Sequence, residues 1–161
     1  MNTINIENKI FEKIKSICIE ATKSSCSAFQ SLFESKIDVI NCKMTLISPN
    51  KMHEMQGFPE DVYFSVLFNT KDINAAFLVT YSENSKKLII DKSNYKEIIK
   101  TNENSFFTEI SNILVGNILL RINKVISTKM EQSVPAISNN MIKTTIDEVA
   151  SMYAVDNNNL L

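Results

Sequence analysis

The segment from residue 106 to about residue 128 constrains the fold of this chain most. Its sequence predicts a long helix, and the polar residues 101–105 before it are of the types that begin helices. Apolar side chains take up most of the perimeter of this helix, so we expect it to be embedded in the core of the protein. These side chains belong to Phe106, Phe107, Ile110, Ile113, Leu114, Val115, Ile118 and Ile122.

One narrow polar stripe interrupts this apolar surface. Four residues form it, and we call them the seam: Ser105, Glu109, Asn112 and Gly116. At ~100° per residue they point into a sector of roughly 60°. Glycine costs up to ~1 kcal/mol relative to alanine in a helix interior, so Gly116 is predicted to permit close approach of another group. Spacing alone favours a plainer interpretation, in which Glu109 and Asn112 are solvated and Gly116 lets another helix pack closely.

The length and composition indicate a single globular domain over residues 1–161. Hydrophobic residues make up 44% and charged residues 22% of the chain, which suits one packed core. The net charge of −1, without a long cluster of Lys or Arg, argues against a nucleic-acid partner. The chain has no apolar run of the ~18–20 residues that span a bilayer and no leader at its N-terminus, so we expect a cytoplasmic protein that does not enter the membrane.

Metal and cofactor chemistry find little support in the sequence. The two glycines are too far apart for a glycine-rich phosphate loop. The three cysteines form no CxxC pair and His53 is the only histidine, so neither a zinc site nor a disulfide framework is expected. We expect His53 to be an exposed loop residue and the cysteines to be small, partly buried residues in a reducing compartment. The cysteines are Cys18, Cys26 and Cys42.

Elsewhere the hydrophobic pattern predicts both helices and strands. Two runs of alternating residues, at 62–69 and 73–81, predict a β-hairpin. Residues 82–100 suit a helix or a short strand, and we favour the helix. The remaining predicted elements are a helix over residues 10–34, a strand over residues 36–47, an extended stretch over residues 129–135 and a final helix that Asn139 or Asn140 caps. Each half of the chain thus holds a long helix followed by an extended stretch, a hint of internal duplication.

The seam and its neighbourhood resemble a known signature. Residues 105–117, Ser-Phe-Phe-Thr-Glu-Ile-Ser-Asn-Ile-Leu-Val-Gly-Asn, fit the pattern Asp/Ser-x-x-x-Glu-x-x-Asn-x-x-x-Gly of the CheC, CheX and FliY chemotaxis phosphatases. Residues 133–136, Ser-Val-Pro-Ala, with Asn140-Met141 after them, resemble the stretch on the C-terminal side of this signature in CheC-type proteins. Residues 19–22 and 36–39 look like the first helix and strand of CheX, so the resemblance covers most of the chain, with the middle matched only in pattern.

The resemblance implies an α/β (α+β) fold, a CheC-like repeat whose mostly antiparallel sheet packs against long helices. It also implies a phosphatase that docks on a phosphorylated CheY-like response regulator in bacterial two-component signalling. In this family the signature glutamate pairs with a receiver lysine and the asparagine orients the water that attacks the aspartyl phosphate. These roles fall here to Glu109 and Asn112, with Ser105 and Gly116 as supporting residues. No cofactor or metal is expected on this chain, because the receiver carries its own Mg²⁺.

One such site is expected rather than two. When the halves are aligned on their extended stretches, the first half has Ser16, Ile19 and Lys23 where the second has the glutamate, asparagine and glycine of the seam. An isoleucine cannot orient water, so the first half has no catalytic asparagine.

Two other functions stay open at this point. The chain could be a non-catalytic CheC-like module that docks receivers or flagellar-switch proteins. It could also be a structural subunit whose seam is merely solvated, an interpretation that would gain if the protein's own loops covered the seam.

The second half is short, so the sheet is expected to lack the final strands of CheC-type proteins. An open strand edge is a template for another chain. We therefore expect this edge to be blunted by a loop or paired in a homodimer. The alternative is a sheet that residues 157–161 or residues 2–7 complete.

Overall fold

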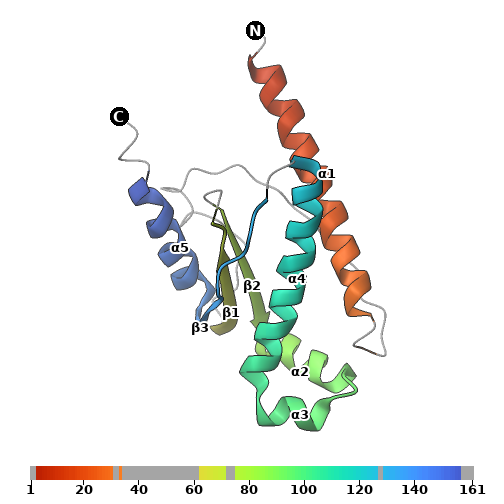
Figure 1. Ribbon diagram of the computed structural model, residues 1–161. Helices are drawn as coiled ribbons and strands as arrows, with labels where there is room; N and C mark the ends of the chain where they lie inside the picture. Colours follow the sequence, from red (N-terminus) through yellow and green to blue (C-terminus); the bar gives the residue numbers. More distant parts are fainter. Residues whose placement is uncertain (1–2, 31–32, 34–61, 72–74, 127–128, 157–161) are drawn as a thin grey trace.

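The computed structural model describes residues 3–30, 33, 62–71, 75–126 and 129–156 (Figure 1). Over these residues the chain forms five helices and a three-stranded antiparallel sheet, which confirms the expected α+β class. The helices are α1 (Thr3–Phe29), α2 (Glu83–Lys92), α3 (Lys96–Thr101), α4 (Glu103–Ile126) and α5 (Ile142–Asp156), and the strands are β1 (Val62–Asn69), β2 (Ala76–Ser82) and β3 (Ala136–Met141).

The predicted hairpin, β1 with β2, supplies two strands of the sheet, and β1 is the central strand. Strand β1 pairs antiparallel with β2 on one side and with β3 on the other, which gives the order β2-β1-β3. Alternation along β1 sends Phe64, Val66 and Phe68 to one face, where all three are buried. Figure 1 shows α4 and α1 layered on one side of the sheet and α5 on the other.

The core lies between this face of the sheet and α4. The rings of Phe64, Tyr81 and Phe107 pack together, with centroids 6.3 Å, 6.1 Å and 4.9 Å apart. Val115 and Leu119 extend the same cluster along the helix. Full burial of one such side chain contributes ~1.5–3 kcal/mol, so these contacts hold α4 firmly against the sheet.

Helix α1 packs along α4 on the side away from the sheet, which confirms that the apolar helix is embedded. The Arg121 guanidinium donates a hydrogen bond of 2.9 Å to Ser24 Oγ across this contact. Near the other end of the contact Phe33 is buried beside Ile110. Helix α4 is therefore apolar on most sides because the sheet covers one side and α1 another.

The first helix is of the predicted type, but its bounds differ from residues 10–34. No proline or glycine precedes Pro49, so nothing in the sequence prevents the helix from beginning at Thr3. It ends at Phe29 because Phe33 forms a β-bridge with Ser93, and a bridge requires extended backbone.

Residues 82–100 are helical, as favoured, but they form two short helices rather than one. Ser82 caps α2 with its side chain. Lys86 ties α2 to the start of α4, because its Nζ lies 2.9 Å from Glu83 and 2.7 Å from Glu103. Burial lowers the pKa of Lys86, but the hydrogen bonds to Glu103 and Glu83 outweigh this effect and raise it. Because Glu103 opens α4, the polar break before that helix is much shorter than predicted.

The predicted cap of the last helix is wrong. Asn139 and Asn140 lie in β3, opposite Phe64 and Tyr63 of β1, and α5 begins only at Ile142. Strand pairing overrides the preference of Asn for helix starts, because the backbone of β3 pairs with β1 over six residues and the side chain of Asn139 stays exposed on this edge strand.

Some predictions fall outside the described residues. These are the strand over residues 36–47, the exposure of His53, the environment of Cys42 and a role of residues 157–161 in the sheet. Residues 3–7 belong to α1, so completion of the sheet by residues 2–7 is wrong. Among the described strands β2 and β3 form the two edges, and an edge that is blunted by a loop or paired in a homodimer stays a prediction.

Candidate functional site

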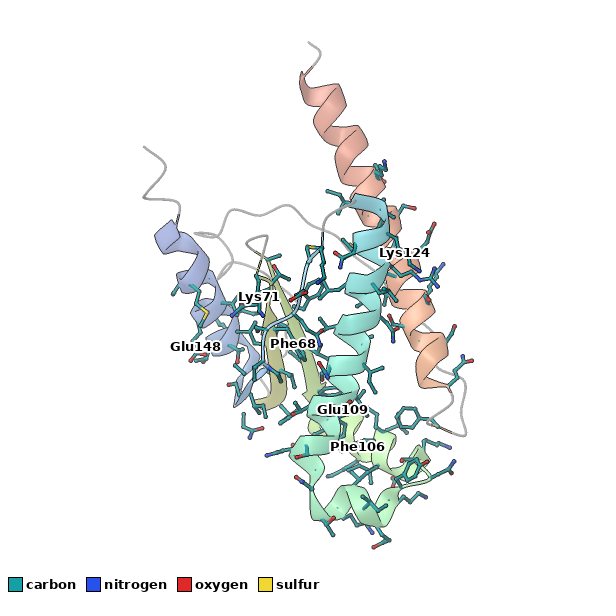
Figure 2. The ribbon with its side chains drawn as sticks, viewed as in Figure 1. Phe68, Lys71, Phe106, Glu109, Lys124 and Glu148 are labelled. Carbon is teal, nitrogen blue, oxygen red and sulfur yellow. The ribbon has the colours of Figure 1, made fainter. Side chains whose placement is uncertain are left out.

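Helix α4 presents the seam on a side that the core does not cover. Ser105 and Glu109 are exposed, whereas Asn112 and Gly116 are half-buried. Figure 2 shows Glu109 near the end of α4 that adjoins α3, with Lys124 at the opposite end. Within the described residues the Glu109 carboxylate forms no ion pair or hydrogen bond, so it is available to another molecule.

The sheet-facing side of α4 is fixed by two buried hydroxyl groups. The Tyr81 hydroxyl lies 2.9 Å from Ser111 Oγ, which donates to the carbonyl of Phe107 at 2.7 Å. Because Ser111 has a single proton and gives it to this carbonyl, Tyr81 is the donor to Ser111. Burial raises the pKa of the Tyr81 hydroxyl above its usual value. These bonds and the surrounding core set the rotation of α4 about its axis, and hence the direction of the seam.

Residues 130–133 cover the C-terminal part of the seam. The Asn123 side chain donates to the carbonyl of Met130 and accepts from its N–H, both at 2.9 Å. Two residues further on, Gln132 Nε2 donates to Asn112 Oδ1. The seam therefore has an open half, Ser105 and Glu109, and a covered half, Asn112 and Gly116.

A one-residue bulge explains why Gln132 reaches α4. Residues 131–133 continue the pairing of β3 with β1, as Ser133 N–H donates to the carbonyl of Asn69 at 2.7 Å. Two residues lie between Leu67 of β1 and Thr70 just beyond it, whereas three lie between their respective partners, Ala136 and Gln132. One extra residue in a ladder turns the side chains beyond it to the other face. Gln132 consequently lies on the face that carries α4, and not on the face of α5 where Ala136 points.

Gly116 does not serve the packing of the described part of this chain. A Cβ atom placed on it would meet only Gln132 Oε1, at 3.9 Å, which is an ordinary van der Waals distance. The interpretation that Gly116 lets another helix of the chain pack closely is therefore wrong for the described residues. A group that occupies the space left by the absent side chain would have to belong to another molecule or to residues outside the described ranges.

Sequence reasoning missed Asn123 and Gln132. Asn123 lies five helical turns beyond Ser105, in the direction of the seam, so the same angular argument could have found it. The signal for Gln132 was Pro135, because a proline in an extended stretch marks an edge or a bulge. In the first half, the counterpart Ile19 is half-buried on α1, and the expectation of a single site stays a prediction.

Comparison of the chain with models of protein families found no match, and a search of curated proteins found none either. The likeness to the chemotaxis phosphatases therefore rests on the residues of the signature and its flanks.

Other features bear on the class of site. Cys18 and Cys26 are half-buried on α1, as expected for the cysteines, and neither is in a disulfide. Over the described ranges no three His, Cys, Asp or Glu side chains come together as a metal site would require. None of the helices seen there combines the length and the apolar character needed to cross a bilayer.

Proposed function

We propose that this protein docks on a phosphorylated CheY-like receiver domain in the cytoplasm and stimulates hydrolysis of its aspartyl phosphate. The observation that carries the proposal is the arrangement of Glu109 and Asn112. An exposed carboxylate that forms no ion pair with any described residue and a half-exposed carboxamide lie one helical turn apart, on one side of a helix that the core holds in place.

The two residues have separate roles in this proposal. Glu109 pairs with a lysine of the receiver and anchors α4 over the phosphorylated aspartate. Asn112 orients a water molecule, whose oxygen bonds to phosphorus as the bond between phosphorus and the aspartate oxygen breaks. Both protons of the water leave with the phosphate as dihydrogen phosphate, and the aspartate is released as a carboxylate. The receiver binds the Mg²⁺ that this reaction needs, and no step requires a metal on this chain.

A rigid helix suits this chemistry. Phosphoryl transfer needs little covalent participation from the protein, and much of the rate gain comes from holding water in line with phosphorus. A carboxamide offers both a donor and an acceptor and does not titrate. The packing of α4 against both the sheet and α1 keeps Asn112 in a constant position.

The decisive experiment measures phosphate release from receivers charged with a small acyl phosphate, with and without this protein. The wild type should accelerate release, and Asn112→Ala should reduce the acceleration at least tenfold, which corresponds to ~1.4 kcal/mol of transition-state stabilisation. Asn117→Ala is the matched control, because Asn117 is also half-buried on α4 but points away from the seam. An Asn112→Ala protein that works at the wild-type rate on the receiver would end the proposal.

Gln132 engages the carboxamide of Asn112, so the protein's own segment covers part of the seam, which is the condition that favours a structural subunit. Glu109 nevertheless stays exposed, and this favours a second candidate, a non-catalytic docking module. In that case the protein would bind the activated receiver through Glu109 without changing its rate of phosphate loss, and the same experiment would show binding alone.

A further inference from the structure

We propose that Gln132 is a positioning residue that fixes the orientation of the Asn112 carboxamide. This inference rests on the proposed function, because it assigns the residue that prepares Asn112 for its role. An asparagine amide can turn by 180°, which exchanges its oxygen and nitrogen. With Oδ1 bonded to Gln132 Nε2, the Nδ2 group points away from Gln132, and within the described residues it has no hydrogen-bond partner of its own.

The backbone on both sides of Gln132 is anchored. Lys71 N–H donates to the carbonyl of Glu131 at 3.2 Å, and Ser133 N–H donates to the carbonyl of Asn69 at 2.7 Å. Ser133 Oγ accepts a further bond of 3.0 Å from the N–H of Asn69. Gln132 is therefore held to the end of β1 from both neighbours, and a side chain on such a backbone can impose a direction on Asn112.

The surroundings of Gln132 allow a positioning role to be distinguished from a contribution to fold stability. Its Oε1 is buried and accepts no hydrogen bond from the described residues, which is unfavourable for a polar atom. A change to methionine, which has a similar length, would remove one hydrogen bond and one unpaired buried acceptor together. Fold stability should therefore change little in Gln132→Met, while Asn112 loses the partner that orients it.

The orientation matters for the proposed reaction. The held amide presents Nδ2–H as a donor, and its Oδ1 keeps a second lone pair for a proton of the attacking water. An amide free to turn would offer these groups in the wrong places for part of the time. Misplacement of a reacting group by about 1 Å can cost ~100-fold in rate, so we expect Gln132→Met to lower kcat by about tenfold and to leave KM for the receiver unchanged.

The test compares Gln132→Met and Gln132→Glu with Glu131→Met. Glu131 is the matched control, because it is the neighbouring long polar residue and is exposed. In a ¹⁵N–¹H spectrum, the side-chain amide signal of Asn112 is the one that Asn112→Ala removes. This signal should move in both Gln132 variants and stay in place in Glu131→Met. Because a glutamate at pH 7 can only accept, Gln132→Glu should draw Nδ2 toward residue 132 and lower kcat at least as much as Gln132→Met.

The outcomes are distinct. An unmoved Asn112 signal in Gln132→Met overturns the inference, and so does an unchanged kcat. A raised kcat also overturns it, since Gln132 would then block Asn112 rather than position it. A wild-type protein that fails to accelerate any receiver would end the proposed function alone, because the amide signal would still report whether Gln132 orients Asn112.

Discussion

The open and covered halves of the seam share one direction on α4 but differ in their surroundings. Glu109 is exposed and has no ion pair within the described residues, whereas Asn112 bonds to Gln132 and lies beside the segment that Asn123 holds in place. The helix is the same in both halves, so the difference comes from residues 130–133. An open carboxylate suits attraction of a partner from solution, and a held carboxamide suits a task that depends on direction.

The largest effect should come from the open half. Glu109→Lys places a positive charge against the receiver lysine that Glu109 is proposed to pair with, and reversal of such a charge costs ~2–5 kcal/mol, or about thirtyfold or more in affinity. Calorimetric titration with a beryllofluoride-activated receiver measures this loss.

Glu148→Lys is the matched control for charge reversal, because Glu148 is an exposed glutamate on α5, on the other side of the sheet (Figure 2). Equal affinity of the Glu109→Lys and wild-type proteins would show that the open half meets no cation of the receiver.

A smaller effect should come from the contact between Asn123 and Met130, which holds the covering segment, residues 130–133, in place. Asn123→Ala leaves the N–H and carbonyl of Met130 without their side-chain partners and should lower the free energy of unfolding by about 1–3 kcal/mol, the cost of an unpaired buried polar group. Denaturant titration measures the loss, with Asn117→Ala as the control on the same helix. Hydrogen exchange should also become faster at the N–H groups of Lys71 and Ser133, which bind the covering segment to β1. If exchange at these two groups stays at the wild-type rate, the segment holds its place without Asn123.

The smallest effect concerns the glycine of the covered half. Gly116→Ala should stabilise the fold by up to ~1 kcal/mol, because alanine is the better helix former and its Cβ meets no atom of the described residues closer than 3.9 Å. In a chain of this size that corresponds to a rise in Tm of about 2–4 °C. A fall in Tm would mean that Gln132 lies closer to the added Cβ of residue 116 than 3.9 Å.

The same variant also shows whether the partner needs the glycine. Lower affinity for the receiver together with a higher Tm would show that a group of the partner occupies the space beside Gly116. Unchanged affinity would leave Gly116 without a role in docking.

Much of the architecture could be predicted from periodicity. The alternation of apolar residues that includes Phe64, Val66 and Phe68 is enough to predict a strand with one buried face, and its partner run predicts the hairpin. The apolar perimeter of the segment around Phe107 is enough to predict a buried helix. Both predictions succeed because the pattern repeats over many residues, so that no single contact decides them.

Predictions of where helices begin and end depended on one or two residues, and several of them were wrong. Asn139 and Asn140 have a strong preference for helix starts, yet they pair with β1, because a preference worth ~1 kcal/mol is overridden by a ladder of backbone hydrogen bonds. Likewise the end of α1 depends on the bridge from Phe33 to Ser93, two residues that lie 60 positions apart in the chain. Such contacts leave no trace in the local sequence.

The sequence by itself determined that Ser105, Glu109, Asn112 and Gly116 share one side of a buried helix, because the angle between successive residues of an α-helix is constant. It did not determine which of them face solvent. Tertiary structure decided that, through the extra residue between Gln132 and Ala136 that turns Gln132 toward Asn112. The register of a strand pair is a property of two segments, so the division of the seam into an open and a covered half arose only when residues 131–133 paired beside the end of β1 and α4 packed on that face of the sheet.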